Sequence, residues 1–313
     1  MTRASSRTRT SASPPTRPGQ EPPANVDYTG VLSGHLAGRA GVVTALMVVL
    51  LGYLLISSLI FQLGAQLAWV VRGRPGQFPD FYTQAMGYGW VEGVAIVNLG
   101  IAMAIPITLA VYRWLDHRPP RWLMSVQPGM RWRYLIGCLV AGALVLNGIY
   151  LLAHLGQGLP YNPPRRAWLW VLLVVLTSPL QAAGEEFLFR GYLLQSFGAL
   201  LRNRWLALGG SALLFALVHG QQNIWLFVDR LGFGLLAGAL VLWTGGLEAG
   251  IGLHVANNVS SFCYAIAAGT MVQTRQVQYA DARTVLLDLA GYAIAGALAW
   301  GLGRRMRVAV RTP

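Results

Sequence analysis

The chain has 313 residues, of which 55% are hydrophobic and 11% are charged, and its mean hydropathy is +0.49. A soluble domain carries about 25% charged residues, so this composition excludes an ordinary soluble protein and indicates a membrane protein. The net charge of +13 comes entirely from arginine, and the arginines lie between apolar runs. That placement is typical of topology signals rather than of a basic groove, so we expect no nucleic acid as a partner.

The first 40 residues differ from the rest of the chain. They are rich in Ser, Thr, Pro and Arg and show no apolar periodicity. Such a segment buries too little apolar surface to fold alone, so residues 1–40 are predicted to be a disordered, solvated tail on the cytoplasmic side.

Apolar runs follow, and about 20 helical residues suffice to cross the roughly 30 Å hydrocarbon layer. The sequence predicts eight spans, of which the fifth is short: 41–71, 89–112, 134–154, 167–194, 205–219, 224–243, 247–267 and 285–302. We therefore expect an all-α polytopic integral membrane protein. Its transmembrane helical domain covers residues 41–303, and a short basic cytoplasmic tail covers residues 304–313.

The arginines set the expected orientation. Five of them lie in the loop 113–133 and four in the last ten residues. With eight spans, this loop and both termini fall on one side, which the positive-inside rule makes cytoplasmic. Arginines at 72, 74, 165 and 166 count against this orientation. The all-arginine bias and the lack of an organelle signal favour a bacterial plasma membrane.

Two adjacent acidic residues stand out inside the fourth predicted span, Glu185 and Glu186, followed by Arg190. Each ionisable group at membrane depth costs about 2.5–3.5 kcal/mol, so a functional site is the default interpretation. On an α-helix, Glu186 and Arg190 lie about 40° apart and can pair, whereas Glu185 lies about 140° from Arg190. We expect a structural Glu186–Arg190 pair and a Glu185 that faces a cavity as a general base. The alternative is that both carboxylates only pack or cap helices near the interface.

Two later spans also carry polar groups at four-residue spacing. Phe215 and His219 end the fifth span, and His254 and Asn258 share a face in the seventh. Taken singly, each histidine is more often a hydrogen-bonded packing residue than a catalyst. Together, an imidazole and a carboxamide on one face can donate hydrogen bonds to an oxyanion, and Glu with His can hold and deprotonate a water.

These three motifs, in this order, resemble those of the CAAX protease and bacteriocin-processing (CPBP/Abi) family. This is a family of intramembrane glutamic proteases that includes the type II prenyl-protein endopeptidases. The resemblance covers residues 167–268, about a third of the chain.

The resemblance implies a bundle of about eight spans with a water-accessible intramembrane cavity, and an endopeptidase that needs no metal or other cofactor. Glu185 would activate water with help from His219, and His254 with Asn258 would form the oxyanion hole. Glu186 and Arg190 would hold the site together, and Phe215 would support it. The expected partners are the lipid bilayer and a peptide or protein substrate, either lipidated or not.

Three other functions stay open. Glu185, His219 and His254 could supply ligands to zinc, although no His-Glu-x-x-His occurs. The buried carboxylates could instead relay protons or bind a cation in a transporter or immunity protein. A scaffold could keep the site for binding alone. The sequence names no substrate.

Overall fold

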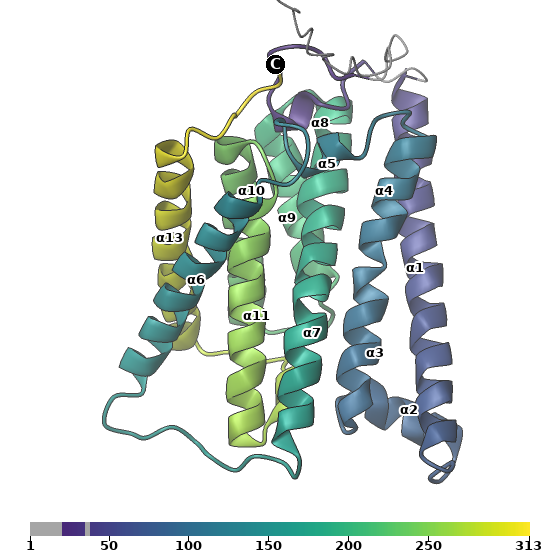
Figure 1. Ribbon diagram of the computed structural model, residues 1–313, viewed down its shortest axis with the longest axis vertical. Helices are drawn as coiled ribbons and strands as arrows, with labels where there is room; N and C mark the ends of the chain where they lie inside the picture. Colours follow the sequence, from purple (N-terminus) through teal and green to yellow (C-terminus); the bar gives the residue numbers. More distant parts are fainter. Residues whose placement is uncertain (1–20, 35–37) are drawn as a thin grey trace, which may run out of the picture.

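The computed structural model describes residues 21–34 and 38–313, and Figure 1 shows the arrangement of their helices. Within these residues there is no strand, only one isolated β-bridge between Ser125 and Gly246. The protein has an all-α polytopic membrane fold. Its helices are η1 (Tyr28–Gly30), α1 (Gly38–Val71), α2 (Phe78–Met86), α3 (Val91–Ala102), α4 (Ala104–Trp114), α5 (Arg121–Met124), α6 (Trp132–Ala153), α7 (Ala167–Glu185), η2 (Glu186–Leu193), α8 (Leu194–Leu201), α9 (Arg204–Leu217), α10 (Ile224–Thr244), α11 (Glu248–Ala268), α12 (Met271–Arg275) and α13 (Ala282–Arg305).

The long helices run side by side along one axis (Figure 1). Helix α11 is central, because it packs against α6, α7, α10 and α13. Helix α7 also packs against α3, and α3 packs against α1. The helix that carries His254 is therefore in direct contact with the helix that carries Glu185.

The predicted number of eight spans is not confirmed. Six helical stretches are long and apolar enough to cross a membrane: Gly38–Val71, Val91–Trp114, Trp132–Ala153, Ala167–Leu201, Ile224–Thr244 and Ala282–Arg305. Helix α9 is apolar, but its 14 residues extend only about 21 Å. Helix α11 has 21 residues and so the required length, but its glutamate, histidine and asparagines lower its hydropathy.

The structure differs from the predicted disordered tail at residues 21–34, which are ordered, and at residues 38–40, which begin α1; residues 1–20 and 35–37 lie outside the described residues. Tyr28, Val31 and Leu32 are fully buried in the main hydrophobic core. The Asp27 carboxylate caps the turn by accepting from the backbone N–H groups of Thr29 and Gly30. Three apolar side chains within five residues are too few to show periodicity, yet they anchor this segment.

The N-terminal segment and the end of the chain lie at the same end of the bundle (Figure 1). The Asn25 N–H donates to the Thr312 carbonyl at 3.1 Å, and the Thr312 N–H donates to Val26 at 3.0 Å. Glu21 pairs with Arg121 of the 113–133 loop at 2.9 Å. The arginine-rich loop and both described ends of the chain therefore share one side, as the arginine distribution predicts.

A glycine allows the N-terminal segment to sit against α8. A Cβ atom on Gly198 would lie 2.3 Å from the Thr29 carbonyl oxygen, which is a backbone atom and cannot move freely. We expect Gly198→Ala to displace residues 27–31 and to expose this segment to limited proteolysis. Gly209→Ala is the matched control, because nothing lies within 4 Å of its Cβ position. Equal protease resistance of the two variants would contradict this packing.

Candidate active site

The site is built where α7 becomes a π-helix. Glu185 is the last residue of α7, and Glu186 is the first residue of η2, a π-helix. A π-helix forms i→i+5 hydrogen bonds, and such turns occur frequently at functional sites. The wider turn also means that the predicted angle between Glu185 and Arg190, which assumes an α-helix, does not apply here.

Glu186 and Arg190 form a buried ion pair. The Arg190 Nη1 donates to Glu186 Oε1 at 2.9 Å, and the two side chains are 0% and 1% exposed. The guanidinium also lies over two aromatic rings, with its Cζ 4.0 Å from the centroid of Phe215 and 5.4 Å from that of Phe233. These contacts offset part of the cost of burying a charge.

His254 lies between the two glutamates. Its Nδ1 is 2.9 Å from Glu186 Oε1, and its Nε2 is 3.4 Å from Glu185 Oε2. One imidazole thus contacts both carboxylates, one through each ring nitrogen.

Gln181 links the remaining predicted residue to Glu185. Its Nε2 donates to Glu185 Oε1 at 2.7 Å, and its Oε1 accepts from Asn258 Nδ2 at 2.9 Å. The sequence-based interpretation assigned Gln181 no role. The available signal was its position, four residues before Glu185 and therefore on the same face of α7.

A cavity of about 740 Å³ opens beside Glu185. Its walls come from α1, α3, α7, η2, α10, α11 and the ends of α9 and α12, and most of the lining side chains are apolar. Of the predicted site residues, Glu185 and His219 line this cavity, and Gln181 joins them. Glu186, Arg190, Phe215, His254 and Asn258 do not line it. His254 contacts the cavity-lining Glu185, and Asn258 donates to the cavity-lining Gln181.

The hydrogen bonding of His219 fixes which nitrogen is available. Its Nδ1 is 2.6 Å from the Phe215 carbonyl oxygen, which only accepts, so Nδ1 carries a hydrogen. In the neutral ring, Nε2 is then an acceptor. The Phe215 ring stacks edge-on against His219 at 4.7 Å between centroids. His219 and Glu185 thus present two acceptors to one cavity.

The structure brings all seven predicted residues into one connected region. Glu185, Glu186, Arg190 and His254 form one cluster, Asn258 joins it through Gln181, and Phe215 lies between Arg190 and His219. Across residues 21–34 and 38–313, no three His, Cys, Asp or Glu side chains are arranged to hold a metal ion.

The region that contains the predicted site residues is similar to a known protein family. Residues 164–260 match the family described as "Type II CAAX prenyl endopeptidase Rce1-like", and this stretch contains all seven predicted residues. A Bacillus subtilis (strain 168) protein, "Uncharacterized protein YyaK", is 30% identical over 170 residues, which cover 50% of this chain and 56% of that protein. No solved structure gives a significant match. The resemblance predicted from the three motifs is confirmed for this region, and it suggests a CAAX-protease-like activity.

Proposed function

We propose that this chain is a membrane-embedded endopeptidase in which Glu185 activates a water molecule without a metal. The observation that carries the proposal is the placement of Glu185. This carboxylate lines a cavity on one side and contacts a histidine on the other, which in turn contacts a buried ion pair. A general base needs both access to its substrate and a fixed orientation.

The reaction uses the two acceptors of the cavity. A water donates one hydrogen to Glu185 and the other to His219 Nε2. Glu185 takes a proton as the water oxygen attacks the scissile carbonyl carbon, and a tetrahedral oxyanion forms. Glu185 then returns the proton to the leaving nitrogen as the C–N bond breaks, so the products are a carboxylate and an amine after proton equilibration.

The residues behind the cavity have positioning roles in this proposal. His254 and Gln181 each hold one oxygen of the Glu185 carboxylate. Asn258 acts through Gln181, and the Glu186–Arg190 pair acts through His254. This assignment gives His254 and Asn258 a different role from the oxyanion hole that the family resemblance implies. The oxyanion is then stabilised by donors on the cavity wall, such as the Arg230 guanidinium.

The proposed substrate is a peptide that reaches the cavity from the membrane. Side chains such as Leu50, Leu54 and Leu193 make most of the wall apolar, which suits an apolar or lipidated segment beside the scissile bond. We propose that the arginine-rich end of the bundle faces the cytoplasm of a bacterial cell and that the protein lies in the plasma membrane.

The test is peptide cleavage by the purified full chain in liposomes, read by mass spectrometry. The substrates are a prenylated C-terminal peptide, its unprenylated counterpart and a pooled peptide library, each with and without a zinc chelator. We expect cleavage that survives the chelator and is lost in Glu185→Ala. Cleavage abolished by the chelator would overturn the metal-free mechanism. A folded protein that cleaves nothing would favour the transport or immunity alternatives.

The positioning role of Gln181 has its own prediction. Gln181→Leu removes both amide hydrogen bonds, so the Glu185 carboxylate loses a partner at one oxygen. Misplacing a catalytic group by about 1 Å costs on the order of 100-fold, so we expect kcat to fall by about 10- to 100-fold while KM changes little. Steady-state kinetics and a melting curve check this result. Unchanged kcat, or a kcat loss explained by unfolding, would contradict it.

A further inference from the structure

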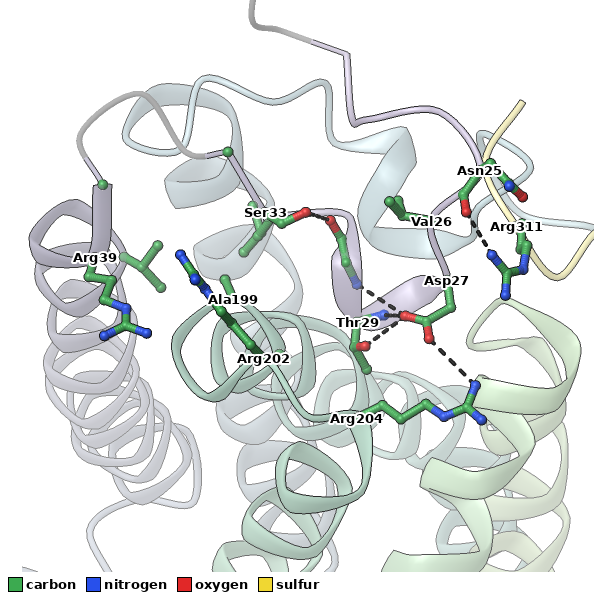
Figure 2. A pocket seen from close by; sticks show the side chains of 16 residues that line it. Asn25, Val26, Asp27, Thr29, Ser33, Arg39, Ala199, Arg202, Arg204 and Arg311 are labelled. Atoms are coloured by element: carbon green, nitrogen blue, oxygen red, sulfur yellow. Dashed lines mark hydrogen bonds and ion pairs between the residues drawn. The ribbon is translucent and has the colours of Figure 1, made fainter.

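A second cavity lies at the end of the bundle where the N-terminal segment meets α1 and α8, and it shares no lining residue with the cavity beside Glu185. Its volume is about 760 Å³, within the usual range for a ligand site. Figure 2 shows four arginines around it, Arg39, Arg202, Arg204 and Arg311. The one acidic side chain among its described lining residues is Asp27, so the lining carries an excess of positive charge.

The existing contacts leave much of this charge uncompensated. The Asp27 Oδ1 already accepts from the N–H and hydroxyl of Thr29 and from the Gly30 N–H, and Oδ2 is 3.7 Å from Arg204. Arg311 donates to the Asn25 carbonyl. Within the described part of the chain, neither Arg39 nor Arg202 makes a hydrogen bond or ion pair, and Figure 2 shows both guanidinium groups at the cavity. A fork of guanidinium donors fits the oxygens of a phosphate group.

The depth of the cavity favours a lipid as the source of that phosphate. Exposed apolar side chains cover α1 from Val43, which is 46% exposed, to Leu67, which is 66% exposed. At 1.5 Å per residue this stretch covers about 36 Å, enough for the roughly 30 Å hydrocarbon layer. Arg39 lies four residues before Val43, about 6 Å along the same helix face. When Val43 lies at the boundary between the hydrocarbon and headgroup layers, this distance places Arg39 in the headgroup layer.

We infer that this arginine cavity binds the phosphate of an anionic phospholipid whose acyl chains lie along the exposed face of α1. The first turn of α1 supports this inference, because Gly38 and Arg39 of that turn line the cavity. The positive end of a helix dipole there adds to the attraction for an anion. This site is independent of the proposed peptidase chemistry.

The test compares variants of the full chain, delipidated in neutral detergent. Arg202→Gly removes one charge without straining the fold, because Arg202 has a left-handed backbone (φ 55°) that glycine adopts freely. Arg307→Gly is the matched control. It has the same residue type and a φ of 54°, it is exposed, and it does not line the cavity.

Phosphatidylglycerol is titrated into each protein, and binding is read by native mass spectrometry and by the rise in Tm. We expect saturable binding to the wild-type chain, about tenfold or more weaker in Arg202→Gly and in Arg39→Gln, and unchanged in Arg307→Gly. Equal affinity in all four proteins would overturn the site. Equal binding of phosphatidylcholine would overturn the preference for an anionic headgroup. Binding of inorganic phosphate that phosphatidylglycerol does not displace would overturn the lipid as its source.

Discussion

Replacing Glu185 with glutamine is expected to reduce peptide cleavage by about 10⁴-fold, because a general base contributes about 10²–10⁴ to the rate and, among the described residues, no other carboxylate lines the cavity. Glu186 is fully buried and engaged by Arg190 and His254. Glutamine keeps the shape of the side chain and one acceptor oxygen, so Gln181 can still donate to it. The fold is therefore expected to remain, and single-turnover kinetics with a cleavable peptide provide the measurement.

The matched control for this variant is Glu92→Gln. Glu92 also lies in a predicted span, but it is 37% exposed and pairs with Arg72 at 2.9 Å, away from the cavity. We expect full cleavage by Glu92→Gln. Retained cleavage by Glu185→Gln would refute the assignment of the base, and loss of cleavage in both variants would point to a general effect of charge on folding.

The second large effect is expected on stability. Arg190→Met leaves the Glu186 carboxylate in a fully buried site without its cation. Removing one partner of a buried ion pair lowers the free energy of unfolding by about 3–5 kcal/mol. For a domain of this size we expect Tm to fall by roughly 6–20 °C. The loss should arise even when the protein holds no substrate, and melting curves in detergent measure it.

The double variant Glu186→Gln with Arg190→Met separates lost charge pairing from lost packing. It removes both charges and leaves an amide oxygen for His254 Nδ1, so its Tm should lie above that of Arg190→Met alone. The exposed pair of Arg72 and Glu92 has the same 2.9 Å separation and serves as the comparison. Its removal should change the free energy of unfolding by about 0–1 kcal/mol. Equal losses of unfolding free energy at the buried and the exposed pair would show that burial does not determine the cost of removing an ion pair.

Sequence periodicity predicted the parts of this molecule that depend on local spacing. Glu186 pairs with Arg190 because four helical residues bring two side chains to one face, and that pairing survives in the π-helix. The long apolar segments also became helices close to their predicted bounds. The predicted spans at α9 and α11 are not confirmed, because α9 is short and polar side chains lower the hydropathy of α11.

The features that periodicity missed depend on contacts between distant residues. The hydrogen bond between Gln181 and Asn258 becomes visible only when α11 brings Asn258 beside α7. The π-turn at residues 186–193 could not be derived from a 3.6-residue period. The short apolar group at Tyr28 lacks any pattern of its own, and it is ordered by a core that the rest of the chain builds.

The pairing of residues 25 and 26 with Thr312 has a consequence for the order of assembly. The bond from the Val26 N–H to the Thr312 hydroxyl, at 3.0 Å, joins positions 286 residues apart. A ribosome adds about 5–20 residues per second, so the N-terminal segment waits on the order of 15–60 s for its partner. During that interval Tyr28 and its neighbours can dock only on helices already inserted. The pairing of residues 25 and 26 with Thr312 therefore forms only after the helices between them have been synthesised.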